Sequence, residues 1–393
     1  MNLGGLLIIS VVAFLAPLAV NAVARLRIPS PVLEIVAGIV IGPAVLGWVR
    51  VDTPIAVISM LGLSMLLFLA GLEIEIGRLR GRLLRSSAIG LATSLALALG
   101  VAYGLHAAGV VQTPLLFAIA LAATALGLVI PVLKDAGELG HPVGNAVVAG
   151  ATLAEFTCIA LLSLFFSAEP TAAGAKIVLL SAFAVAVLLI GAVLLRYGES
   201  PRISAVLVRL QDTTAQIRVR FAVVLFIAFA TLATTLGLET ILGAFVAGAL
   251  LKVVDRDAAV VHPQTTTKLE AIGFGFLVPV FWVTTGLRFD LHALFASAST
   301  LAQVPIFLAA LLVVRGVPAA VYRRSLSRRQ TVAVGLFQAT SLSFIVAATQ
   351  IGVQLHLITS GTAAALVGAG LLSAVLFPPI ALGLIGGNAR VRA

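Results

Sequence analysis

The chain has 393 residues, of which 61% are hydrophobic and 10% charged, and its mean hydropathy is +1.18. This composition excludes a water-soluble globular protein, because too little polar surface remains to cover a core. The net charge is +10, but the basic residues stand just outside apolar runs without interleaved aromatics. Membrane topology explains that placement and excludes nucleic acid as the partner. We expect an all-α polytopic membrane protein, neither an enzyme nor a holder of a cofactor.

A bilayer core about 30 Å thick needs roughly 20 helical residues to cross it. On that length we predict about 13 transmembrane segments, at residues 3–24, 31–48, 55–75, 84–108, 113–133, 143–166, 176–195, 217–236, 238–254, 269–287, 300–321, 331–351 and 357–385.

The basic residues orient these segments. Of the 25 Lys and Arg, 21 follow odd-numbered segments, 3 lie in the other connections (Arg50, Lys176 and Arg288), and Arg315 lies inside an apolar run. The positive-inside rule then places the N-terminus outside and the C-terminus in the cytoplasm. The predicted location is a bacterial inner membrane, with the lipid bilayer as surroundings.

The two halves of the chain share three short patterns in the same order. Gly71-Leu72-Glu73 matches Gly286-Leu287-Arg288, and Glu34-x-x-x-Gly38 matches Glu239-x-x-x-Gly243. The third match pairs ATALG at 123–127 with ATSLS at 339–343.

These matches predict a single transmembrane transporter domain over 1–393. The last predicted segment ends within ten residues of the C-terminus, so we expect that a soluble regulatory domain is absent or was removed. Repeat one covers about 3–166, a linker helix about 176–195, and repeat two about 217–385. The odd linker segment reverses the second repeat, so the repeats have inverted topology. That architecture is typical of secondary transporters, which bind substrate at discontinuous helices near the bilayer midplane.

Two matched segments carry the residues expected at helix breaks. Proline removes a backbone donor, and small hydroxyl side chains can satisfy the carbonyls that an unwound turn releases. The alternative is that these hydroxyls bond to their own helix or join neighbouring helices. The predicted broken-helix and pocket residues are Thr124, Ala125, Gly127 and Pro131 in the first segment and Gln338, Thr340, Ser341 and Ser343 in the second.

Two charges lie deep in apolar segments. Glu155 stands in the middle of 143–166, where a charge costs on the order of 2.5–3.5 kcal/mol, so it is a candidate functional group. A protonated structural carboxyl is the alternative. Arg315 cannot lose its charge. Glu155 is the acidic residue at comparable depth, which makes it the predicted partner of Arg315; the alternative is that Arg315 snorkels past Gly316 toward Arg323.

Four other acidic residues, Glu34, Glu73, Glu75 and Glu239, stand near predicted segment ends. A solvated carboxylate has a low cost there. Glu73 is the secondary candidate for ion binding because it follows Gly71 within the apolar run. The five histidines lie at unrelated spacings, and we predict no metal site built from them.

In this order the residues resemble the monovalent cation/proton antiporter superfamily, in particular its second branch of sodium/proton antiporters and potassium-efflux-type transporters. The resemblance covers nearly the whole chain and is carried by Glu34 to Leu46, Phe68 to Ile76, Leu242 to Leu251 and Pro279 to Leu291. It implies a homodimer in which a core domain with two crossed discontinuous helices moves against a dimerisation domain. Segments 113–133 and 331–351 match those helices.

The resemblance also implies that Glu155 binds the cation and the proton in turn, and that Arg315 matches a basic residue of the family. Family members usually have Asp preceded by a polar or acidic residue, whereas this chain has Ala154-Glu155; many have Lys where Arg315 stands. The predicted function is alternating-access exchange of Na⁺ or K⁺ for protons, electroneutral at 1:1, with the cation held by Glu155, Thr124 and backbone carbonyls.

Two other functions stay open from the sequence. One is a proton-coupled exporter of an organic ion on the same scaffold, for which Ala154 would widen the pocket. The other is a channel-like or sensor subunit.

Overall fold

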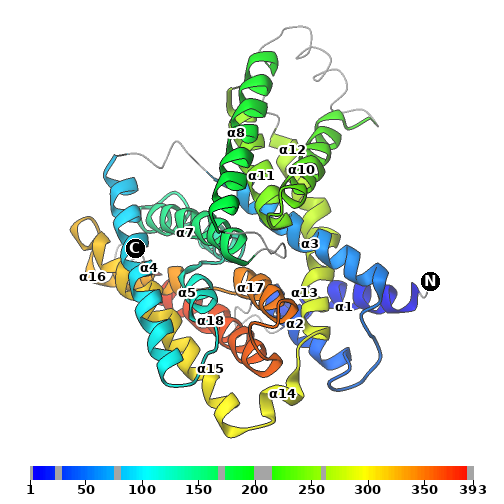
Figure 1. Cartoon of the computed structure of the whole chain (residues 1–393), viewed down its shortest axis with the longest axis vertical. Coiled ribbons are helices and arrows are strands. Elements are labelled where there is room, and N and C mark those ends of the chain that lie inside the picture. The colour runs from blue at the N-terminus through cyan, green and yellow to red at the C-terminus, as the bar shows by residue number, and fades with distance from the viewer. Residues whose placement is uncertain are drawn as a thin grey trace. The chain divides into compact units, whose positions relative to one another are not determined.

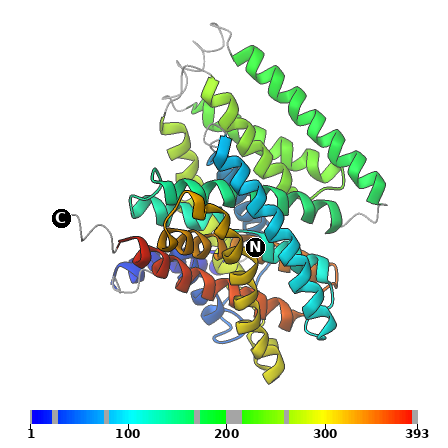
Figure 2. The ribbon, with the colours of Figure 1, turned by 90° about the vertical axis from the view of Figure 1, so that its left-hand side faces the viewer.

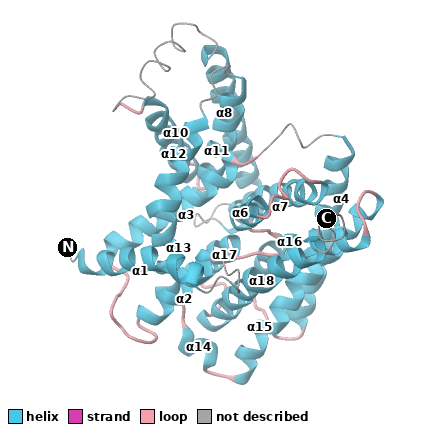
Figure 3. Ribbon diagram, turned by 180° about the vertical axis from the view of Figure 1, so that it is seen from behind, coloured by secondary structure: helices cyan, strands magenta, loops and turns pink. Residues whose placement is uncertain are grey.

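A computed structural model describes residues 3–22, 29–74, 81–166, 173–198, 215–257 and 263–386. Across these ranges the regular elements are helices, and no strand occurs among them (Figure 3). The all-α prediction is therefore confirmed. In chain order the elements are α1 (Leu3–Ala22), α2 (Ser30–Ile41), α3 (Thr53–Leu72), α4 (Gly81–Ala107), α5 (Pro114–Ala122), α6 (Leu126–Asp135), α7 (Pro142–Phe166), α8 (Ala173–Gly198), α10 (Ile217–Thr235), α11 (Thr240–Asp257), α12 (Pro263–Ile272), η1 (Gly273–Leu277), α13 (Val278–Leu287), α14 (Leu291–Phe295), α15 (Ala298–Leu311), η2 (Leu312–Gly316), η3 (Val317–Arg324), α16 (Arg328–Ala339), α17 (Ser343–Gln354) and α18 (Ser360–Gly386).

Within the described ranges, 10 helical stretches are long and apolar enough to cross a membrane. Three further apolar helices are shorter, at Leu3–Ala19, Ser30–Ile41 and Thr240–Val254. Each predicted segment overlaps a helix, while the exact number of crossings stays a prediction. The predicted end of the second segment at 48 is wrong, since α2 ends at Ile41. Gly42 precedes Pro43, which disfavours the helical conformation, and its backbone is extended (φ −77°, ψ 179°).

The chain divides into two compact units. Unit 1 comprises Met1–Ala56, Glu75–Cys158 and Trp282–Ala393, and unit 2 comprises Val57–Ile74 and Ile159–Phe281. In unit 2, α11 packs against both α8 and α10, the green helices of Figure 1. The division does not follow the two predicted repeats, because each unit contains segments from both. The repeats themselves stay a prediction.

Glycines allow several close helix crossings, of which one in each unit is made by a glycine from both helices. In unit 1, a Cβ on Gly38 of α2 or on Gly286 of α13 would collide with a backbone carbonyl of the other helix. In unit 2, the same is true of Gly71 on α3 and Gly248 on α11. Small residues permit such close backbone approach in membranes, where dispersion contacts drive helix association. In the predicted repeats, α2 of repeat one corresponds to α11 of repeat two, and α3 corresponds to α13. The crossing of α2 with α13 is therefore equivalent to the crossing of α11 with α3.

The part of unit 1 that positions the site is built around α16, whose last seven residues are all buried. Ser327 and Gln330 form a capping box that sets the start of this helix, with the Ser327 hydroxyl accepting from the Gln330 N–H at 3.3 Å. Helix α16 then packs against α18, η2 and η3. Figure 2 shows α4, in cyan, beside the yellow and gold stretch that contains η2 and η3, and α4 contacts both.

The α2–α13 crossing predicts the effect of a larger side chain. We expect Gly286→Val to lower the thermal unfolding temperature of the detergent-solubilised protein, because the added methyl groups would have to displace the α2 backbone. Overpacking typically costs ~1–3 kcal/mol. The control is Gly100→Ala on α4, where an added Cβ meets open space; it should be neutral or stabilise by up to about 1 kcal/mol. Equal melting of Gly286→Val and the wild type would contradict the close crossing.

Candidate functional site

Two helices of unit 1 are interrupted in their middle. Residues 123–125 separate α5 from α6, and residues 340–342 separate α16 from α17. The backbone is extended at Ala123 (φ −77°, ψ 158°) and at Thr340 (φ −74°, ψ 111°). Both interruptions fall on the matched patterns ATALG and ATSLS. The prediction of two discontinuous helices is confirmed.

Some predicted break residues lie in the helices beside the breaks. Gly127 and Pro131 belong to α6, Gln338 to α16, and Ser343 is the first residue of α17. The expectation that Pro131 marks the unwound turn is wrong. The helix continues through it, because a proline removes a single donor and leaves the neighbouring hydrogen bonds of α6 in place.

The two unwound segments bond to each other. The Ala125 N–H donates to the Thr340 carbonyl at 3.0 Å, and the Thr124 hydroxyl donates to the Gln338 carbonyl at 2.6 Å. These residues are buried, with Thr124 and Thr340 at 0% exposure. Backbone groups released by the breaks are thus paired where no water is at hand. Helix packing brings together two sites more than 210 residues apart in sequence.

Helix α18 holds the second break from another side. The Ser341 N–H donates to the Ser373 hydroxyl at 3.2 Å, and that hydroxyl donates to the Gly370 carbonyl at 2.7 Å. Gly370 allows the close approach, since the Ser341 carbonyl oxygen lies 2.8 Å from where a Cβ would be. Sequence reasoning missed Ser373, which in an apolar run is indistinguishable from any small residue.

Glu155 lies on α7, is 1% exposed, and reaches the first break. Its Oε2 accepts the N–H of Leu126, the first residue of α6, at 3.2 Å. The carboxylate therefore stands at the positive end of the α6 half-helix, which favours a negative charge. Ala154 is also fully buried. The sequence predicted a buried carboxylate beside a broken helix, and Glu155 lies there. The role of Glu155 in ion binding stays a prediction.

Arg315 lies on the π-helical turn η2 and is 1% exposed. Its Nε donates to the Thr124 hydroxyl at 2.9 Å, and a terminal nitrogen donates to the Gly150 carbonyl of α7 at 3.4 Å. The guanidinium thus points into unit 1, and the snorkelling alternative is wrong. Arg315 contacts Thr124 and Glu155 contacts Leu126, so both charges meet the same short stretch. A direct ion pair between them stays a prediction.

Two hydroxyls of α4 support the stretch that carries Arg315. Pro318 has no N–H to offer the carbonyl four residues earlier, Val314, and the buried Ser94 hydroxyl donates to that carbonyl at 2.8 Å. One turn beyond Pro318, the Tyr322 hydroxyl lies 2.8 Å from the hydroxyl of Ser87. Neither serine was predicted. The available signal was their spacing of seven residues on one face of an apolar helix.

Gly150 is a further residue that sequence reasoning missed. A Cβ there would collide with the side-chain amide of Gln338, whose nitrogen donates to the Ala146 carbonyl of the same helix at 3.4 Å. Gly150 therefore lets α16 approach α7, while its carbonyl accepts from Arg315. This glycine lies on the same helix as Glu155.

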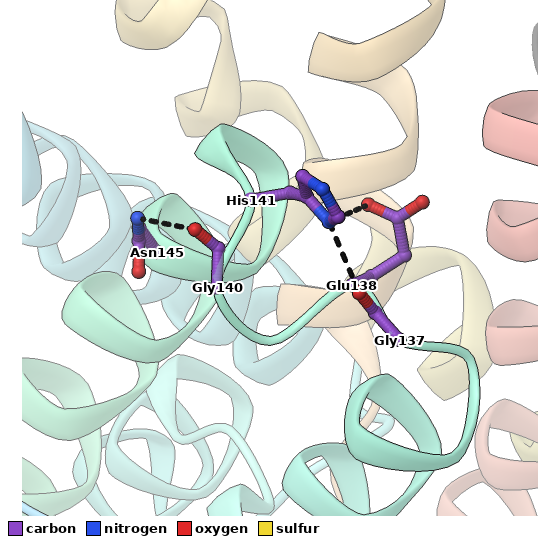
Figure 4. Close-up of polar contacts among 5 residues, drawn as sticks. All are labelled: Gly137, Glu138, Gly140, His141 and Asn145. Atoms are coloured by element: carbon purple, nitrogen blue, oxygen red, sulfur yellow. Dashed lines mark hydrogen bonds and ion pairs between the residues drawn. The ribbon is translucent and has the colours of Figure 1, made fainter.

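The connection between α6 and α7 is short and internally bonded (Figure 4). His141 Nδ1 lies 3.0 Å from the Gly137 carbonyl and 3.7 Å from Glu138 Oε2, and the Asn145 amide donates to the Gly140 carbonyl at 3.4 Å. Gly137 has φ +70°, a conformation that glycine adopts without strain. The connection joins the half-helix α6 directly to the helix that carries Glu155.

The other acidic candidates differ from expectation in one case. Glu34 is 4% exposed within α2 and forms no hydrogen bond or ion pair with the rest of the described chain, so its expected solvated position is wrong. Glu73 is half-buried just after the end of α3 and belongs to unit 2, whereas Glu155 belongs to unit 1. Glu239 is half-buried, and Glu75 lies outside the described residues. No cluster of three or more His, Cys, Asp or Glu that could hold a metal occurs among the described residues.

Comparison with known proteins defines the class. A sequence profile of the family described as "Sodium/hydrogen exchanger, transmembrane" matches residues 10–382. The chain therefore belongs to the sodium/hydrogen exchanger family. It is an integral membrane protein of a transporter family.

Two relatives and one solved structure cover most of the chain. The Bacillus subtilis protein named "Putative Na(+)/H(+) antiporter YjbQ" is 29% identical over 96% of this chain, and this chain spans 62% of that protein's length. "Probable Na(+)/H(+) antiporter 3" of Methanocaldococcus jannaschii is 25% identical over 94% of this chain and 93% of its own. The fold is similar to the sodium proton antiporter MjNhaP1 from the same archaeon, with a TM-score of 0.69, 15% identity, and coverage of 98% of this chain and 97% of that one.

The position of Thr124 between Arg315 and Gln338 generates a stability prediction. We expect Thr124→Val to lower the free energy of unfolding by ~1–3 kcal/mol, because it leaves a buried donor and a buried acceptor without a partner. The control is Thr93→Val on α4, an exposed residue whose hydroxyl bonds only to Ile89 of its own helix; it should change stability by less than about 0.5 kcal/mol. Thermal unfolding in detergent measures both. Similar losses in the two variants would contradict the role of Thr124.

Proposed function

We propose that this chain is a secondary active transporter that exchanges a monovalent cation, Na⁺ or K⁺, for protons by alternating access. Membership of the sodium/hydrogen exchanger family supports the reaction class. The observation that carries the proposal to particular residues is the buried Glu155 carboxylate bonded to the first N–H of a half-helix, beside the crossing of two unwound segments. A buried acid in a membrane helix is expensive and marks an ion or proton path.

Exchange follows from the inability of one carboxylate to hold two cations at once. The ionised form of Glu155 binds a dehydrated Na⁺ or K⁺, for which carboxylate and carbonyl oxygens are suitable ligands; protonation releases the cation. If the loaded forms alone reorient, each proton carried one way is matched by a cation carried the other way. The N-terminus of α6 favours the ionised form by its N–H group and its dipole.

Arg315 and Thr124 have a positioning role in this proposal. The guanidinium cannot release a proton, so it supplies a fixed positive charge near the carboxylate. Thr124 accepts from Arg315 and donates to Gln338, so its hydroxyl fastens the first break to the second. Its direct part in cation binding, expected from the sequence, would use the remaining lone pair of the same oxygen.

The proposed setting is the bacterial inner membrane, with the N-terminus outside and the C-terminus in the cytoplasm. The distribution of 21 of the 25 Lys and Arg supports that orientation. We further propose two inverted repeats and a homodimer. The glycine crossings α2–α13 and α3–α11 occupy equivalent places in the two predicted repeats, which supports the repeats.

Glu155→Gln is expected to abolish cation-driven proton movement, because Gln keeps the shape of Glu but cannot ionise. Glu155→Asp should retain partial activity, since its carboxylate is withdrawn by one methylene. The measurement is proton flux in proteoliposomes after addition of Na⁺, K⁺ or Li⁺. Glu270→Gln on α12 serves as the control and should exchange like the wild type. Normal exchange by Glu155→Gln would remove Glu155 from the mechanism.

Exchange is also expected to be electroneutral, one cation for one proton. Both loaded states of a single site carry the same charge, so the transport rate should not depend on membrane potential. Proteoliposomes clamped at several voltages with valinomycin and potassium test this through the rate of Na⁺/H⁺ exchange. A voltage-dependent rate would reveal a second proton carrier, and Glu34→Gln and Glu73→Gln would then identify it.

A further inference from the structure

A cavity of about 310 Å³ lies in unit 1, beside the half-helix α17 that follows the second break. One face of α17 forms a wall, with Val346, Gln350 and Val353 at helical spacing. Ala364 and Val367 of α18 also line it, as do residues 288–290 just after α13. The polar side chains of Thr349, Gln354 and Ser360 complete much of the lining. More of the lining is apolar than polar. The cavity therefore suits a ligand with an apolar body.

Arg288, the first residue after α13, brings a positive charge to this cavity. Its partly exposed guanidinium forms no hydrogen bond or ion pair with the rest of the described chain. Partial burial lowers the pKa of Arg288 from its ordinary value, because the apolar surroundings penalise the charged form. Asp290 also lines the cavity, but its carboxylate caps α14 by accepting the Ala293 N–H at 2.8 Å. Among the described residues, therefore, no carboxylate forms an ion pair with Arg288.

These features define a ligand class. A guanidinium binds a carboxylate through two parallel hydrogen bonds, and apolar walls select for an attached hydrocarbon. Arg288 favours an anion over a cation, because the Asp290 carboxylate is already engaged at the start of α14. A small inorganic anion would leave the apolar part of the lining without a partner. We propose that the cavity binds a small organic monocarboxylate, with its carboxylate on Arg288 and its apolar tail between α17 and α18.

Such a ligand would contact the half-helix that follows the second break. Helix α17 begins at Ser343, directly after residues 340–342, and Val346 lies three residues further on. Three residues of helix correspond to about 4.5 Å. A bound tail would therefore tie α17 to α18 and to the end of α13 close to the crossing. We expect the bound ligand to inhibit cation/proton exchange by restraining α17. This inhibition rests on the proposed function, whereas the binding of the ligand does not.

Isothermal titration of the detergent-purified full chain with acetate, butyrate and hexanoate tests the binding. Affinity should rise with chain length, and hexanol and hexylamine should not bind. Arg288→Gln should weaken hexanoate binding by about tenfold or more, the loss expected from a charge-assisted contact. Arg50→Gln, a matched change at another exposed arginine, should leave it unchanged. Ala364→Phe should weaken hexanoate more than acetate by filling the wall.

Three results would overturn the binding site: equal affinity for chloride, acetate and hexanoate, hexanoate binding that survives Arg288→Gln, or the absence of binding to the wild type. The flux measurement uses hexanesulfonate, because permeant weak acids carry protons across bilayers. Hexanesulfonate should slow cation/proton exchange by the wild type and leave exchange by Arg288→Gln unchanged. An unchanged rate at a concentration that saturates binding would refute the coupling to α17. A wild-type protein that binds hexanoate but exchanges no cation would instead refute the proposed function.

Discussion

The pairing of the two unwound segments is the interaction on which the rest of unit 1 depends. Interrupting a helix inside hydrocarbon releases backbone donors and acceptors that no water can satisfy. The bonds from Ala125 to Thr340 and from Thr124 to Gln338 satisfy several of them at once. Because each break supplies the partner of the other, the four half-helices α5, α6, α16 and α17 are joined at one point. Under the proposed function, ion binding at that point would affect all four half-helices.

The charges are arranged around this junction so that each has a specific partner. The Glu155 carboxylate receives the first N–H of α6, and Arg315 binds the Thr124 hydroxyl and the Gly150 carbonyl. The fixed charge of Arg315 and the titratable charge of Glu155 are thus held by adjacent parts of one backbone stretch. These hydrogen bonds offset part of the cost of burying each charge in a membrane helix bundle.

Close packing keeps this arrangement in place without large polar surfaces. Ser94 donates to the carbonyl before Arg315, Ser373 accepts from the second break, and Gly150 makes room for Gln338. Each contact requires a small side chain, because a larger one would separate the backbones. The glycine crossings α2–α13 and α3–α11 use the same principle away from the site. Hydroxyl and glycine residues therefore determine the geometry around the two charges.

The sequence by itself determined the helical membrane class, the positions of the two breaks, and the burial of Glu155 and Arg315. Hydropathy, charge and short matched patterns are properties of neighbouring residues, so they can be read along the chain. Only the tertiary structure decided that α2 ends at Ile41 with Glu34 buried, that Pro131 stays helical, and that Arg315 turns inward to Thr124. It alone revealed Ser94 and Ser373 as supports. These outcomes depend on which helix lies beside which, and a hydrogen bond between residues 220 apart, such as Ser94 to Val314, leaves no local trace in the sequence.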